Sequence, residues 1–286
     1  MINNNKIILG TAQFIPSYGI SNKRNIVEMN NIIDQAIESG INLLDTAPAY
    51  GKAESALGSI RREHQVITKF PKFDKNKEDF IHFLEKSIQS SLSRLKRSKI
   101  EYILFHDFES FIENFDQDLL NFLEDLKDNK VIGKLGFSVY SVEEVHLLFD
   151  LLSFDVLQFP LNPFNQKFMQ DDFLKKLKSM NIETHARSVF LQGLLLSMNG
   201  SINLKSHEKM QPFLIKWFSE VKKSFNSPID ACLEFINQVD CLDKYLVGVT
   251  STNELKQILN FQSQSKKFNF SQFDNNDKLF DPRFWV

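Results

Sequence analysis

Four side chains whose groups exchange or steer protons stand at, or just after, the ends of short apolar segments. Asp45 and Lys69 lie at the ends of two such segments, and His106 ends a third. Tyr50 follows Asp45 by five residues. A carboxylate, a phenol, an ammonium and an imidazole that meet in one place can carry out general acid–base chemistry, with the phenol as the acid.

Tyr50 can act as an acid at neutral pH only if neighbouring groups change its pKa. A tyrosine titrates near pH ~10 when unperturbed, which is too high for ready proton exchange at neutral pH. A nearby Lys69 ammonium is expected to lower the pKa of Tyr50, and an Asp45 carboxylate paired to that ammonium keeps it charged and aimed. A histidine alongside can donate a hydrogen bond to a carbonyl oxygen. Together these roles describe reduction of a carbonyl group, with the hydride supplied by another molecule.

The elements that must position these groups alternate along the chain. Short β-branched or apolar segments are separated by stretches with helical periodicity, and strict alternation of this kind indicates parallel strands joined by right-handed crossovers. Capping-box patterns, Ser141 with Glu144 and Ser251 with Glu254, begin two of the helices. The eight expected strands are 7–11, 42–46, 66–69, 102–106, 134–138, 156–159, 182–188 and 245–249.

Eight such units in 286 residues predict a parallel eight-stranded (β/α)8 TIM barrel, an α/β fold of one domain over residues 1–286. A doubly wound sheet would place a glycine fingerprint after its first strand, and the sequence that begins at Gly10 does not match one. The wide spacing between strands seven and eight predicts a large loop and an extra helix there. An aromatic tail, residues 280–286, ends the chain. A barrel gathers its chemistry at the C-terminal ends of its strands, so the four residues are expected to converge.

Composition excludes several classes of protein. With 34 basic and 36 acidic side chains the net charge is −2, and no basic stripe suggests a nucleic-acid partner. Two cysteines support neither a disulfide scaffold nor a four-cysteine zinc site, and no metal is predicted. No apolar run reaches the length of a membrane helix, and the start lacks a signal peptide. We therefore expect a cytoplasmic protein that does not bind membranes.

Three segments resemble the aldo-keto reductase family. The sequence LDTAPAYG at 44–51, followed by Glu54 and Gly58, is similar to the family's most recognisable signature. The sequences ITKF at 67–70 and LFH at 104–106 are similar to its lysine and histidine strands. The resemblance implies a (β/α)8 barrel that binds an extended NAD(P)H without a Rossmann domain. It also implies the roles of the tetrad: Tyr50 as general acid, Lys69 and Asp45 as its tuning pair, and His106 orienting the carbonyl.

The same resemblance implies contacts to the nicotinamide. Ser138 and Gln158 match residues that hold the carboxamide in the family, whereas Val139 replaces an asparagine. Arg187 stands where many members place a tyrosine that stacks on the nicotinamide. A planar guanidinium can also stack, and it can bind a phosphate or an anionic substrate.

The remaining cofactor positions lie in other loops. The lysine and arginine that grip a 2′-phosphate in the best-known members are absent, and Asn253 and Glu254 occupy that region. Because a glutamate suits a ribose diol better than a phosphate, we expect weak discrimination, with NADP(H) favoured and NAD(H) possible. The other residues assigned to cofactor binding are Gly10, Thr11, Gly193, Gly248, Thr250 and Ser251.

The sequence thus favours an oxidoreductase that reduces a small polar aldehyde or ketone, such as a sugar-derived one. The loops 14–22, 107–118 and 191–211 are expected to line its pocket. Two alternatives stay open. One is an NAD(P)H-binding regulatory or redox-sensor subunit without significant turnover, and the other is a lyase or isomerase that uses Lys69 to form a Schiff base. Nothing in the sequence defines the oligomeric state.

Overall fold

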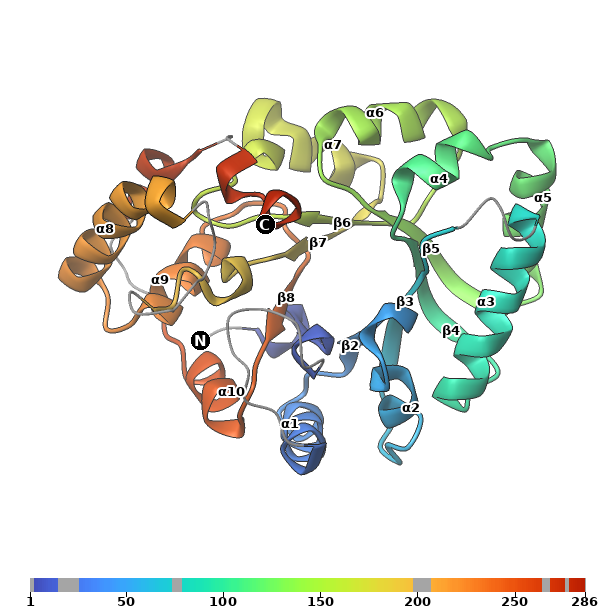
Figure 1. Cartoon of the computed structure of the whole chain (residues 1–286), viewed down its shortest axis with the longest axis horizontal. Coiled ribbons are helices and arrows are strands. Elements are labelled where there is room, and N and C mark those ends of the chain that lie inside the picture. The colour runs from blue at the N-terminus through green and yellow to red at the C-terminus, as the bar shows by residue number, and fades with distance from the viewer. Residues whose placement is uncertain are drawn as a thin grey trace.

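Eight parallel strands close into a barrel in the order in which they occur along the chain (Figure 1). The computed structural model describes residues 3–14, 26–73, 79–197, 207–263, 268–275 and 278–285. Each strand pairs with its two neighbours in the sequence, and the first pairs with the last. The strands are β1 Ile7–Gly10, β2 Leu43–Asp45, β3 Gln65–Phe70, β4 Ile100–Phe105, β5 Ile132–Ser138, β6 Val156–Pro160, β7 Glu183–Arg187 and β8 Lys244–Gly248.

Helices surround the ring of strands (Figure 1). In the described residues they are α1 Ile26–Glu38, α2 Ala53–Leu57, α3 Phe80–Leu95, α4 Phe108–Glu113, α5 Gln117–Asp128, α6 Val142–Leu151, α7 Phe173–Ser179, α8 His207–Ser224, α9 Pro228–Asn237 and α10 Thr252–Leu259. Two of them, α8 and α9, fall between β7 and β8, in agreement with the expected extra helix beside the usual crossover helix. Residues 198–206 of the expected loop, and residues 15–22 of the first pocket loop, lie outside the described part of the chain.

The (β/α)8 prediction is confirmed, and all eight strands were placed within two residues of their observed starts and ends. The predicted caps are also present, because the Ser141 and Ser251 side chains accept hydrogen bonds from the backbone N–H groups of Glu144 and Glu254. Each glutamate carboxylate, however, accepts from the amide one residue before its serine, that of Tyr140 or Thr250.

Alternate residues of each strand face the barrel interior, because successive side chains of a strand point to opposite faces. A small apolar layer fills the middle, and a larger apolar layer lies between strands and helices. The interior layer contains Ile8, Leu43, Ile67, Tyr102, Leu104 and Val156, with Leu246 packed against it. Counting two residues on from a member of this apolar layer gives the next side chain that faces the interior. That side chain lies nearer the C-terminal end of the barrel.

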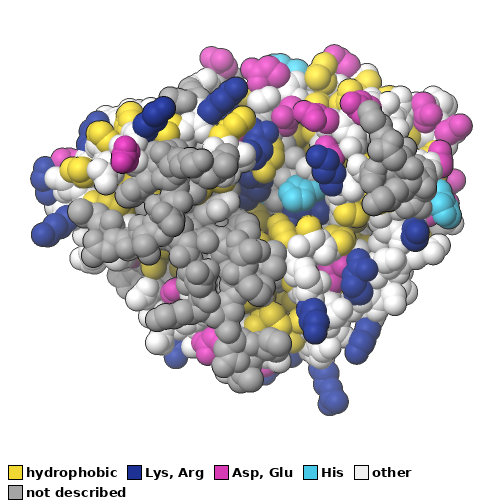
Figure 2. All heavy atoms as spheres, viewed as in Figure 1, with side chains coloured by type: hydrophobic (Ala, Val, Ile, Leu, Met, Phe, Trp, Pro, Cys, Tyr) yellow, Lys and Arg dark blue, Asp and Glu magenta, His cyan; other side chains and the backbone are white. Residues whose placement is uncertain are grey.

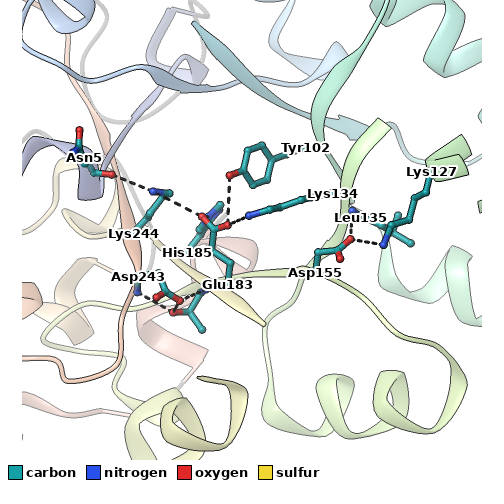
Figure 3. A network of polar contacts seen from close by, with 11 residues as sticks. Asn5, Tyr102, Lys127, Lys134, Leu135, Asp155, Glu183, His185, Asp243 and Lys244 are labelled. Atoms are coloured by element: carbon teal, nitrogen blue, oxygen red, sulfur yellow. Dashed lines mark hydrogen bonds and ion pairs between the residues drawn. The ribbon is translucent and has the colours of Figure 1, made fainter. Parts of the chain in front are cut away.

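A polar cluster occupies the opposite end of the barrel, near the starts of the strands (Figure 3). Its centre is the Glu183 carboxylate, which accepts hydrogen bonds from Lys134 and Tyr102 and contacts the fully buried His185 at 2.9 Å. The Lys244 ammonium lies 3.9 Å from the same carboxylate. Burial would raise the pKa of Glu183, but the hydrogen bonds and charges of His185 and Lys134 hold it at about 2.

The C-terminal tail returns to the barrel mouth. Phe280 is buried and stacks on Phe164, which follows β6, at 4.5 Å between ring centroids. Pro282 borders the cavity described below. The tail therefore both covers apolar surface and forms part of the pocket wall. No helix in the described part of the chain is long and apolar enough to span a membrane.

Candidate active site

A cavity of about 470 Å³ opens at the C-terminal ends of the strands. Figure 2 shows this face of the molecule, hollowed near its centre, with histidine and basic side chains beside hydrophobic ones at the hollow. The structure brings all four members of the predicted tetrad to this cavity. The predicted residues that line it are Gly10, Asp45, Tyr50, Lys69, His106, Ser138, Gln158, Arg187, Gly193, Gly248, Thr250 and Glu254.

Asp45 and Lys69 form a buried ion pair at the floor of the cavity. The Lys69 Nζ atom lies 2.7 Å from Asp45 Oδ1 and donates a second hydrogen bond to the Thr46 carbonyl at 3.0 Å. The other Asp45 oxygen accepts from the Gln158 side-chain amide at 2.9 Å. Asp45 ends β2 and Lys69 is the penultimate residue of β3, so the parallel register itself brings them together. The carboxylate therefore holds the ammonium in one position.

Tyr50 lies beside that ammonium. A short 3-10 turn, Pro48–Tyr50, follows β2 and carries the phenol to the cavity, with Lys69 Nζ 5.2 Å from its ring centroid. The hydroxyl has no hydrogen bond to any described residue, so it is available to a ligand. Burial raises the pKa of Tyr50, the Asp45 carboxylate raises it further, and Arg187 lowers it.

This direction is opposite to the one expected from sequence. The prediction that Lys69 lowers the pKa of Tyr50 neglected two features: the phenol is desolvated, and the charge of Lys69 is compensated by the adjacent Asp45. A phenol that stays protonated at neutral pH can give a proton but cannot readily accept one. In the site without ligand Tyr50 therefore holds its proton, but its raised pKa opposes release of that proton unless the resulting phenolate is stabilised.

His106 completes the set immediately after β4. Burial, together with the positive charges of Lys69 and Arg187, lowers the pKa of His106 to about 4. The imidazole is therefore neutral at physiological pH and keeps one N–H for donation. His106 and Tyr50 line the same cavity, and each carries a hydrogen that it can donate.

Two polar groups lie where the resemblance places the nicotinamide carboxamide. The Ser138 hydroxyl is buried, borders the cavity and has no hydrogen-bond partner in the described structure. The Gln158 amide nitrogen is engaged by Asp45, and its oxygen accepts no hydrogen bond from a described residue. Val139 is fully buried, and its carbonyl accepts from Arg187 at 3.1 Å. One unpaired hydroxyl and one unpaired carbonyl oxygen match the complementary donors and acceptors of an amide.

Arg187 packs differently from the expected stacking residue. Its guanidinium lies 4.0 Å from the centroid of the Tyr140 ring, and the Arg283 guanidinium lies 3.5 Å from the same centroid. Both guanidinium groups therefore contact the same aromatic ring. Arg283 is in turn paired with Asp281. Tyr140 and the tail thus fix the position of Arg187 at the cavity wall.

The other end of the cavity is formed by the start of α10 and neighbouring loops. Glu254 accepts hydrogen bonds there from the amide of Thr250 at 2.6 Å and from its hydroxyl at 3.0 Å. Two predicted residues do not line the cavity. The Thr11 hydroxyl is buried and donates to the Asp45 carbonyl, and Ser251 caps α10. Their assignment to cofactor binding stays a prediction.

The sequence analysis missed Tyr140 and Arg283. Tyr140 lines the cavity two residues after Ser138, and its position just beyond the end of a barrel strand was a usable signal. Arg283 is almost one hundred residues from Arg187 in the chain, and no local pattern connects them. The tail that carries Arg283 was described from its sequence as aromatic, without a role for this arginine.

The fold and the site together define a (β/α)8 barrel whose mouth holds a Tyr–Lys–Asp–His set. The model of the Aldo/keto reductase family matches residues 6–279. The chain belongs to this family of oxidoreductases, whose members in general use NAD(P)H and act on small carbonyl compounds.

Individual relatives are more distant. The chain is 28% identical over 175 residues to aldo-keto reductase YhdN of Bacillus subtilis, covering 57% of this chain and 52% of the relative. It is 28% identical over 161 residues to D-arabinose 1-dehydrogenase of Saccharomyces cerevisiae, covering 51% and 46%. The matched region thus spans about half the length of these curated relatives. Glycerol dehydrogenase of Gluconobacter oxydans has a similar fold, with a TM-score of 0.69 at 19% identity over 92% of this chain and 88% of that one.

Proposed function

We propose that the protein reduces a small polar aldehyde or ketone, such as a sugar-derived one, with NAD(P)H as hydride donor and Tyr50 as general acid. The observation that carries this proposal is the unengaged Tyr50 hydroxyl in a cavity it shares with the buried Asp45–Lys69 pair and a neutral His106. The family and its named dehydrogenase relatives support the reaction class.

The residues at the cavity fit a nicotinamide cofactor. Ser138 offers a buried hydroxyl without a partner, and Gln158 offers an amide oxygen, both suited to a carboxamide. Gly10, Gly193 and Gly248 line the same cavity and present backbone without side chains. We assign these residues to cofactor binding. When bound, the cofactor supplies a hydride.

The protein's own residues bind the carbonyl oxygen of the substrate and protonate it. The His106 N–H and the Tyr50 hydroxyl both donate to the carbonyl oxygen, which orients the substrate and stabilises negative charge as it develops. Tyr50 transfers its proton to that oxygen as the alcohol forms. Lys69, fixed by Asp45, stabilises the phenolate that remains. The Lys69 ammonium attracts the negative phenolate more strongly than the neutral phenol. It therefore lowers the energy of Tyr50 during and after proton transfer more than before it.

The alternatives remain testable. A Schiff-base role for Lys69 requires a neutral, accessible amine, whereas its ammonium is buried and bonded to Asp45 and to the Thr46 carbonyl. Borohydride trapping of a substrate carbon on Lys69 would favour that role. A regulatory subunit would bind NADPH saturably and turn over no carbonyl compound.

Replacing Tyr50 by phenylalanine tests the proposal. The Tyr50→Phe variant keeps the ring beside Lys69 but lacks the proton, so NADPH oxidation across a panel of aldehydes should fall by about 10²–10⁴-fold. NADPH binding, followed by fluorescence, should be retained. Tyr245→Phe is the matched control, since it removes a buried hydroxyl that does not border the cavity. A Tyr50→Phe variant that turns over like the parent would show that another group supplies the proton.

We also propose weak discrimination between the two cofactors, with NADP(H) favoured. The motivation is Glu254, whose carboxylate borders the cavity at Thr250. A carboxylate repels a 2′-phosphate and accepts hydrogen bonds from a ribose diol. Dissociation constants of NADPH and NADH for the parent provide the measurement. A hundredfold preference for NADPH, about 2.7 kcal/mol, would contradict this proposal.

A further inference from the structure

Arg187 is the cation at the cavity whose charge has no partner within the described structure. It ends β7 and borders the cavity, and one terminal nitrogen donates to the Val139 carbonyl at 3.1 Å. Its Nε atom is buried and has no hydrogen-bond partner. No described carboxylate lies within ion-pair distance of its guanidinium. A buried donor on a charged group is costly unless something accepts from it.

The neighbouring cations are compensated. Lys69 is paired with Asp45, and Arg283 is paired with Asp281. Arg187 therefore contributes an uncompensated positive charge on one side of the cavity. An anionic ligand group that reached this side of the cavity would gain the attraction of that charge and could accept from the guanidinium.

Arg187 is also close to the reacting groups. Its charge lowers the pKa of Tyr50 and of His106, so it acts on the two donors assigned to the carbonyl oxygen. The contact with the Tyr140 ring helps to hold the Arg187 guanidinium in place, and Arg283 contacts the same ring. A fixed, planar guanidinium suits the planar fork of a carboxylate.

We propose that Arg187 binds a carboxylate group of the substrate, so that the preferred substrates are small aldehydes or ketones that carry a carboxylate a few bonds from the carbonyl carbon. This inference rests on the proposed reductase function and names its substrate class. A single guanidinium balances a singly charged carboxylate, whereas a phosphate ester carries close to two charges at neutral pH.

The test compares two substrates of equal chain length. The parent should reduce 4-oxobutanoate with a kcat/KM at least tenfold above that for butanal. The Arg187→Met variant should bring this ratio close to one, through a raised KM for 4-oxobutanoate. Because Arg187 also acts on Tyr50 and His106, the readout is the ratio of the two substrates within each enzyme, and not the rate for butanal alone. Arg62→Met, an exposed arginine paired with Asp34 and Glu38, is the control and should keep the ratio. A parent without the preference, or an Arg187→Met variant that retains it, overturns the inference.

Further measurements separate this inference from other outcomes. If Arg187→Met weakens NADPH binding and leaves the substrate ratio intact, Arg187 serves the cofactor and the inference is wrong. A preference for glyceraldehyde 3-phosphate over glyceraldehyde, without one for 4-oxobutanoate, also overturns the carboxylate assignment. If the parent reduces no carbonyl compound, the proposed function fails by itself. Butanoate should then still raise the Tm of the NADP⁺-loaded parent but not that of Arg187→Met, and equal Tm values would refute the carboxylate site.

Discussion

The Asp45–Lys69 ion pair provides a quantitative prediction about the floor of the site. The charged atoms are 2.7 Å apart, and the two side chains are only 3% and 2% exposed. At an effective dielectric constant of about 20 their attraction amounts to about 6 kcal/mol, most of which offsets the loss of water from both groups. Removing one partner leaves the other charge buried and uncompensated, which typically costs about 3–5 kcal/mol.

Three variants measure this coupling: Asp45→Asn, Lys69→Met and the double variant. Each single change should lower the free energy of unfolding by about 3–5 kcal/mol, because an isolated buried charge remains. The double variant removes both charges and should cost about 2–3 kcal/mol less than the sum of the two. Urea unfolding followed by circular dichroism gives the four values. Asn at position 45 retains an acceptor for Gln158, so the difference isolates the charge.

The control is Lys175→Met, which breaks an exposed pair with Asp172 and should leave the unfolding free energy nearly unchanged. The reasoning fails if the costs of Asp45→Asn and Lys69→Met add in the double variant within about 0.5 kcal/mol. In that case the two groups would be stabilised separately, by Gln158 and by the Thr46 carbonyl, and Asp45 would not be what holds the ammonium next to Tyr50.

Three further predictions follow from single residues. Because burial lowers the pKa of His106 to about 4, its imidazole should stay neutral and kcat/KM for a neutral aldehyde should be flat from pH 6 to 8; a break near 6.5 would contradict this. The pKa of Glu183 is lowered to about 2 from 4.5, so its contribution to stability is full above pH 4.5 and lost as the pH falls to 2. The unfolding free energies of parent and Glu183→Gln should therefore differ at pH 7 and converge near pH 2. A Cβ at Gly58 would lie 2.3 Å from the Arg94 carbonyl, so Gly58→Ala should lower the free energy of unfolding by about 1–3 kcal/mol, measured by urea titration.

The meeting of Asp45, Tyr50, Lys69 and His106 in one place was predictable, because two repeating patterns in the sequence determine where strand residues lie. The alternation of strands and helices determines the barrel, and the two-residue alternation within each strand determines which side chains face inward. Asp45, Lys69 and His106 each lie two residues beyond an interior apolar residue: Leu43, Ile67 and Leu104 respectively. The polar residue at the next interior position therefore belongs to the catalytic layer. This rule needs no tertiary information once the strands are located.

The properties that the sequence did not reveal depend on contacts between distant segments. The direction of the pKa of Tyr50 is set by burial and by the Asp45 carboxylate, and no local pattern encodes that burial. The support of Arg187 requires Tyr140 after β5 and Arg283 in the tail. Contacts among these three residues form only when the folded barrel brings their separate segments together. Sequence therefore located the reacting groups better than it described their environment.

The family signature at 44–58 contains residues that react and a residue that positions them. Its first half supplies reacting groups, whereas Glu54 in its second half is buried and accepts hydrogen bonds from Thr68 at 2.7 Å and from Arg94 at 2.6 Å. Thr68 immediately precedes Lys69 in β3, and Arg94 lies in α3. The Glu54 carboxylate therefore ties the helix after Tyr50 to the strand that carries the ammonium. Spacing within the signature sets the distance between phenol and ammonium, because both are attached to elements that Glu54 holds together.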